Sequence, residues 1–188
     1  LLMLPDSLEI LRNTLGLAIA KMILGTVVPI VFALMLNEVT QDGLKKFVQT
    51  SVYLPYFLSW VLLGSIFLSM LQLDGVVNYV IRLFGGEPVM FMASNRWAPV
   101  IMVVTDVWKN FGYGSIIYLA ALTNVDTNLY EAAALDGASR LQQMRHVTLP
   151  AIAPTIVLVS TLNLGNVLNA GFDQIFNMYN ELIYESVD

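Results

Sequence analysis

The sequence predicts an all-α polytopic membrane protein, and three observations lead to this prediction. Apolar residues make up 57% of the 188 residues, and the mean hydropathy is +0.70. Soluble proteins contain about 45–50% apolar residues. Charged residues contribute only 12%. Four apolar runs are long enough to cross a bilayer, which requires about 20 residues. They lack the alternation of barrel strands, so helices are the predicted way to satisfy the backbone in lipid.

The four expected spans belong to a single transmembrane domain over residues 1–188, and lie near residues 12–37, 51–72, 97–122 and 149–171. The first contains Lys21, whose ammonium we expect to snorkel toward the membrane surface. Helix kinks are expected near Pro29 and Pro154. Because the sequence opens at Leu1 and stops without a closing element, we expect a piece of a longer protein, incomplete at both ends.

Several functional classes are disfavoured. The net charge of −5 offers no basic surface for nucleic acid. The sequence has no cysteine and one histidine, His146, so no Cys or His metal cluster is expected. Neither a nucleophile–base pair nor a P-loop is present, so an enzyme is not predicted and no cofactor is expected.

A polar segment, residues 123–148, separates the last two runs. Asp126 is a candidate N-cap for a helix over residues 127–135. Gly137 then supplies the left-handed conformation that ends a helix. A second short helix is expected over residues 138–146. The segment is therefore predicted to be a helix–turn–helix elbow with a surface of small residues.

The spacing within this elbow resembles a family signature. Glu131-Ala132-Ala133 is followed by three residues and Gly137, and nine further residues lead to Val147-Thr148-Leu149-Pro150. This resembles the EAA motif of the permeases of bacterial binding-protein-dependent ABC importers, in which isoleucine is the commonest residue at the position of Val147. The resemblance implies that the elbow is a cytoplasmic coupling loop and that this chain holds four of six spans. It assigns ATPase coupling to Glu131, Ala132, Ala133, Asp136, Gly137 and Arg140.

The resemblance also implies partners and a location. An ABC permease works in the bacterial plasma membrane, surrounded by lipid, with a second permease that is identical or homologous. A cytoplasmic ATPase dimer hydrolyses the ATP, and an extracytoplasmic solute-binding protein delivers the solute. Residues 172–188 would form the external loop before the last span. In that topology residues 72–96 are also external, with an aromatic belt of Tyr79, Phe84, Phe91 and Trp97.

Further segments are similar to the carbohydrate-uptake branch, and within it to the LplB-like oligosaccharide and polysaccharide permeases. These are residues 49–55, 108–109, 117–122 and 171–176. A sugar or oligosaccharide is therefore the implied solute. The alternatives are a non-sugar solute, or a structural or assembly membrane protein, which would not need the EAA spacing.

Polar residues within the spans are candidates for the translocation path: Asp106, Lys109, Tyr113, Asn163, Asn166 and Asn169. Asp106 and Lys109 share a helix face and either line the path or form an internal pair. The three asparagines fall within an arc of about 120° and either contact sugar hydroxyls or join helices. Tyr113 either stacks on sugar or is ordinary packing.

Overall fold

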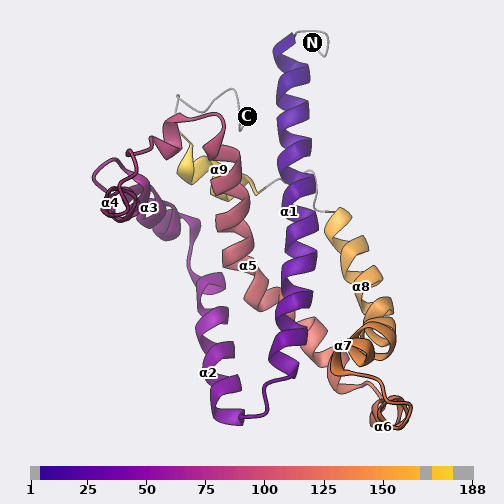
Figure 1. Ribbon diagram of the computed structural model, residues 1–188. Helices are drawn as coiled ribbons and strands as arrows, with labels where there is room; N and C mark the ends of the chain where they lie inside the picture. Colours follow the sequence, from indigo (N-terminus) through magenta and orange to yellow (C-terminus); the bar gives the residue numbers. More distant parts are fainter. Residues whose placement is uncertain (1–4, 166–170, 180–188) are drawn as a thin grey trace. The chain divides into compact units, whose positions relative to one another are not determined.

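The structure is a computed structural model that describes residues 5–165 and 171–179 (Figure 1). Every regular element in these ranges is a helix, which confirms the predicted fold class. The α-helices are α1 (Pro5–Asn37), α2 (Asp42–Tyr53), α3 (Trp60–Leu71), α4 (Val76–Leu83), α5 (Trp97–Thr123), α6 (Thr127–Leu135), α7 (Arg140–Gln143), α8 (Leu149–Leu164) and α9 (Phe172–Met178). Two short 3₁₀ helices, η1 (Leu54–Phe57) and η2 (Phe91–Ala93), and a π-helical turn, η3 (Met144–Thr148), complete the described chain.

The chain divides into two compact units, which are described separately. The first unit comprises residues 1–21, 55–109 and 166–188, and the second comprises residues 22–54 and 110–165. The helices α1 and α5 contribute residues to both.

In the second unit, α1, α5 and α8 pack around a small apolar core formed by Ala33, Leu34, Tyr118, Leu122 and Ile152. Two helices of this unit pack closely at a glycine, which has no side chain. A Cβ added to Gly112 of α5 would lie 2.2 Å from the carbonyl oxygen of Val52 in α2. Small residues at such contacts let membrane helices approach until their backbones touch.

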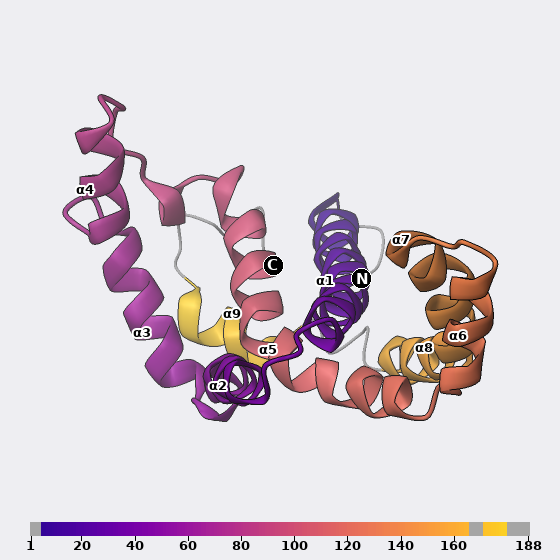
Figure 2. The ribbon, with the colours of Figure 1, turned by 60° about the horizontal axis from the view of Figure 1, so that its bottom comes forward.

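In the first unit, α9 packs against α3, as Figure 2 also shows. A Cβ added to Gly64 of α3 would lie 3.3 Å from the carbonyl oxygen of Asn177, and Met178 is fully buried. Helix α9 begins after Gly171, whose φ is 77°. Residues 172–178 are therefore a packed helix, and their place in an external segment remains a prediction.

The second expected span differs from the structure. Residues 51–72 are not one helix: α2 ends at Tyr53, η1 follows, and α3 begins after Ser59, whose hydroxyl accepts from the Leu62 amide. Pro55 lies at this break and cannot donate a backbone hydrogen bond. Helix α8 begins at Leu149 as expected and is described to Leu164.

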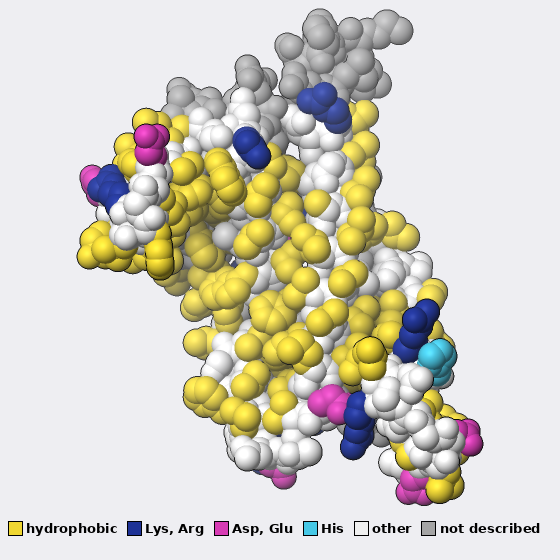
Figure 3. Space-filling view, viewed as in Figure 1, with side chains coloured by type: hydrophobic (Ala, Val, Ile, Leu, Met, Phe, Trp, Pro, Cys, Tyr) yellow, Lys and Arg dark blue, Asp and Glu magenta, His cyan; other side chains and the backbone are white. Residues whose placement is uncertain are grey.

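Three helical stretches of the described residues are long and apolar enough to cross a membrane: residues 11–37, 60–83 and 140–164. Helix α5 has 27 residues but is not among them, because Asp106, Lys109 and Asn110 lower its hydropathy. The four-span topology remains a prediction. Apolar side chains nevertheless cover most of the visible surface of both units (Figure 3), as expected for helices that face lipid.

Candidate functional site

The first arm of the elbow is α6, and its bounds match the predicted helix. Asp126 is its N-cap, as expected: the Asp126 carboxylate accepts a 2.9 Å hydrogen bond from the Asn128 amide. Glu131 and Ala132 are exposed on this arm, and Ala133 is half-buried. The arm therefore presents a carboxylate beside a methyl-sized surface, against which another backbone can approach closely.

The turn after α6 is a Schellman motif, in which two amides beyond the helix bond back to its last carbonyls. Gly137 donates to the carbonyl of Ala134 at 3.0 Å, and Ala138 donates to that of Ala133 at 2.9 Å. Gly137 adopts φ 79°, which confirms the predicted left-handed conformation. Asp136, the C-cap, is exposed.

The second arm differs from the expected helix over residues 138–146. Ser139 and Gln142 form a capping box, so α7 begins at Arg140, which is exposed. The helix does not stop before Leu149: it passes through the π turn η3, where the Leu149 amide bonds to the Met144 carbonyl, and continues as α8. The residues from α7 through η3 into α8 are thus helical without an intervening loop.

One side-chain contact joins the two arms, and a second holds the turn against α7. The hydroxyls of Tyr130 in α6 and Thr148 in η3 lie 2.9 Å apart. The buried Gln143 side chain donates to the carbonyl of Ala138 at 3.1 Å. The Tyr130–Thr148 contact therefore links α6 to the residue immediately before α8.

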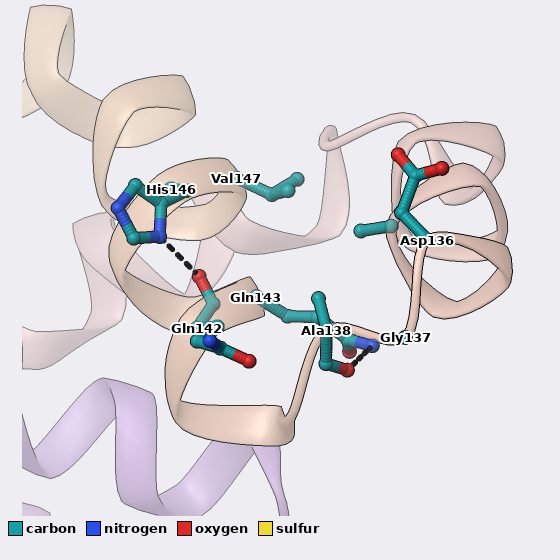
Figure 4. Close-up of a pocket in the computed structure, with 8 residues that line it drawn as sticks. Asp136, Gly137, Ala138, Gln142, Gln143, His146 and Val147 are labelled. Atoms are coloured by element: carbon teal, nitrogen blue, oxygen red, sulfur yellow. Dashed lines mark hydrogen bonds between the residues drawn. The ribbon is translucent and has the colours of Figure 1, made fainter.

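A pocket of about 300 Å³ lies between the arms (Figure 4), lined by Ala133, Asp136, Gly137, Ala138, Gln142, Gln143, His146 and Val147. His146 is exposed, as expected, and its Nδ1 lies 3.0 Å from the carbonyl oxygen of Gln142. Three large apolar side chains are exposed on the elbow: Leu129 is 50% exposed, while Leu135 and Leu141 are nearly bare, at 89% and 74%.

A buried polar cluster in the first unit was not expected from the sequence. The ammonium of Lys21 in α1 is 8% exposed and donates to the Oε1 atom of Gln174 in α9 at 2.7 Å. The Gln174 side chain is fully buried, and its amide donates to the Met102 carbonyl and to the Thr105 hydroxyl of α5, both at 2.7 Å. Lys21 therefore points into the unit, and the expectation that it snorkels outward is wrong.

Gly171 completes this cluster. A Cβ at this position would lie 2.8 Å from the Lys21 ammonium and 3.8 Å from the Asp106 carboxylate. Asp106 thus lies beside the cluster, and its charge acts on both Lys21 and Lys109. The network joins α1, α5 and α9 through charged and amide groups that lipid cannot solvate.

Lys109 is 8% exposed and supports the break between η1 and α3. Its ammonium donates to the Tyr56 carbonyl at 2.7 Å and lies 5.4 Å and 5.7 Å from the ring centres of Tyr56 and Trp60. The contact satisfies a carbonyl at the end of η1.

The other candidates for the translocation path do not form a cluster within the part of the chain that the structure describes. Tyr113 is 43% exposed, and Asn163 is half-buried near the end of α8. Asn166 and Asn169 lie outside the described residues. A role in substrate contact remains a prediction for all six candidates.

Comparison with known proteins bears directly on the elbow and on most of the chain. The chain is similar to the polygalacturonan/rhamnogalacturonan transport system permease protein YteP of Bacillus subtilis, with 43% identity over 94% of this chain and 55% of YteP. It is also similar to protein LplB of Bacillus subtilis, with 41% identity over 95% of this chain and 56% of LplB. This chain therefore spans about half the length of these relatives.

A solved structure gives the same result. The bacterial alginate ABC transporter, in complex with an alginate pentasaccharide-bound periplasmic protein, contains a chain that matches all of this one with a TM-score of 0.96 and 38% identity. The match covers 66% of that chain. Residues 25–172, which include the whole elbow, match the model of one family, and the chain belongs to that family: the binding-protein-dependent transport system inner membrane components.

Proposed function

We propose that the chain is part of the permease subunit of an ATP-driven importer, in which residues 126–148 dock on a cytoplasmic ATPase subunit. In this proposal the permease forms the path for an oligosaccharide that an extracytoplasmic solute-binding protein delivers. ATP is hydrolysed by the partner subunit. A second permease, identical or homologous, completes the path.

The observation that carries the proposal is the pair of bare leucines on a rigid elbow. Caps on both sides of Gly137 fix the backbone of the turn, yet Leu135 and Leu141 make little contact within the described chain. Exposed apolar groups on a fixed helical frame indicate a surface for another protein. Helix-in-groove docking buries such side chains. Burying one leucine contributes about 1.5–3 kcal/mol.

The direction of coupling follows from the continuity of the elbow with α8. Movement of a docked ATPase would displace α6 and α7, and the contacts Tyr130–Thr148 and Gln143–Ala138 would carry that displacement into α8. Because η3 lacks the ordinary i−4 bonding at its end, bending would concentrate there.

The names of two similar proteins support a carbohydrate substrate. YteP is a polygalacturonan/rhamnogalacturonan permease, and the solved neighbour imports the acidic polysaccharide alginate. We extend an oligosaccharide substrate to this chain on that basis and on the segments similar to the carbohydrate-uptake branch.

The test uses the full-length permease and its partners, with Leu135→Glu and Leu141→Glu introduced together. Losing two buried leucines should cost at least about 3 kcal/mol, a hundredfold or more in affinity for the ATPase subunit. Gln41→Glu is the control, because it adds a charge to an exposed polar position outside residues 126–148, where the native side chain makes no capping bond. We expect the double variant to lose the co-purifying ATPase and sugar uptake while the control keeps both. Retention of the ATPase by the double variant would contradict the proposal.

A further inference from the structure

Helix α4, in the first unit, has its polar side turned inward. Asn78 is fully buried and makes three hydrogen bonds with the main chain around it. Its amide donates to the carbonyls of Gln72 and Val89, both at 2.9 Å, and its oxygen accepts from the Val89 amide at 2.7 Å. These bonds tie the main chain before and after α4, at Gln72 and Val89, to the middle of the helix. They fix which side of α4 faces inward.

The opposite side of α4 is bare and apolar. It carries five exposed side chains: Val76, Tyr79, Val80, Leu83 and Phe84, the last of which is 89% exposed. Their spacing of three and four residues places them on one stripe, which at about 100° per residue lies opposite Asn78. The neighbouring helix α3 also exposes the apolar side chains of Val61, Leu62 and Ile66.

Two requirements restrict what can surround this stripe. Water is an unfavourable neighbour for five adjoining apolar side chains. The hydrocarbon core is unfavourable too, because the turns before and after α4 interrupt the helical hydrogen bonding and expose charged Asp74 and Glu87. With eight residues, α4 is only about 12 Å long, too short to cross the core alone.

We propose that α4 lies in the plane of the membrane interface, with this stripe immersed among lipid acyl chains and the flanking turns in the headgroup layer. The interface meets both requirements, and the chain belongs to a family of inner membrane components. Trp97, 41% exposed at the start of α5, is an aromatic anchor suited to the same depth. Phe91, expected in the aromatic belt, is instead buried and packs edge-on against Trp97 at 5.7 Å between ring centres. The belt therefore consists of Tyr79, Phe84 and Trp97.

The inference makes α4 a surface anchor rather than the end of a span. The stretch of residues 60–83 has the length and composition of a span, but the break after α3 at residues 72–75 divides it. Gly75 makes that break tight, since a Cβ there would lie 2.3 Å from the Met70 carbonyl oxygen. An anchored α4 would hold the external end of this unit at a constant depth while other helices tilt.

The experiment is a spin-label depth measurement on the full-length permease within its complex, in bilayers of phosphatidylethanolamine and phosphatidylglycerol. Val80→Cys and Phe84→Cys place a nitroxide on the stripe, and Asp74→Cys and Glu87→Cys place one on each flank. Collision rates with oxygen, which partitions into lipid, are compared with those of a water-soluble nickel chelate. Tyr79→Cys repeats the test on the same stripe if Val80→Cys or Phe84→Cys impairs assembly.

We expect the stripe labels to favour oxygen, at a depth of about 5–10 Å, and the flank labels to favour nickel. Three other results would overturn the inference. Nickel access to the stripe equal to that of the flanks would mean that the stripe faces water or awaits a soluble partner. Low access for both reagents would mean that another protein segment covers it. Flank labels as deep as the stripe labels would mean that α4 belongs to a span.

Discussion

Substitutions of Gly137 separate two effects: strain in the backbone of the elbow, and a clash with a docked ATPase. Its φ of 79° is strained for any residue with a Cβ, at a cost of about 1–2 kcal/mol. A Cβ built at this position meets no atom within 4 Å. For alanine, therefore, backbone strain is the main cost within the elbow.

This separation predicts an order among three variants. Gly137→Asn should retain most coupling, because asparagine tolerates the left-handed region. Gly137→Ala incurs the backbone cost, which lowers the ratio of intact to altered turn by a factor of about 5–30. Gly137→Trp has the same backbone cost and adds a bulky side chain where we propose that the ATPase docks. Transport should thus fall in the order Asn, Ala, Trp, with Trp close to zero.

The assay is sugar uptake and binding-protein-stimulated ATP hydrolysis by the reconstituted full-length complex. Gly43→Ala is the control, since a Cβ there also meets no atom within 4 Å and its φ is not positive. External sugar-loaded binding protein should still dock on every variant. Wild-type uptake and ATP hydrolysis in Gly137→Trp would refute the reasoning that the elbow contacts the ATPase.

Three further predictions concern helix packing and one candidate residue of the path. Gln174→Leu should lower the thermal stability of the purified complex, because breaking a buried charged contact costs about 3–5 kcal/mol; adding Lys21→Met should restore part of it, and an additive loss would contradict the network. Gly112→Ala should sharply reduce the amount of folded protein, since its Cβ would lie 2.2 Å from the main chain of α2, whereas Gly25→Ala, in open space, should leave expression unchanged. Asn166→Leu should impair uptake while assembly and basal ATP hydrolysis stay near normal; loss of folded protein would instead favour a role in helix packing.

The parts of the elbow that the sequence predicted well are those set by local chemistry. Asp126 caps α6 and Gly137 ends it, because both effects depend on groups within a few residues of each other. The start of the second arm was placed too early because Ser139, rather than Gly137, sets it. That signal was available: Ser139 and Gln142 have the spacing of a capping box.

The features that the sequence did not predict depend on distant partners. Lys21 points inward because Gln174, 153 residues away, offers an acceptor in α9. The break between α2 and α3 is supported by Lys109, 53 residues from the carbonyl that it satisfies. A lysine in an apolar run does not by itself reveal whether it snorkels to the surface or meets a buried acceptor. The choice depends on tertiary contacts that no local pattern contains.

The central claim, that the elbow docks on a cytoplasmic ATPase, is tested most directly by photo-cross-linking in intact bacterial membranes. Ala132, exposed on α6, is replaced in the full-length permease by a benzoyl-phenylalanine, and Tyr79 on α4 is replaced likewise as a control. Irradiation should join the elbow position to the ATPase subunit, and the control should give no such adduct. An elbow label that gives no ATPase adduct in a transporter that still takes up sugar would contradict the account.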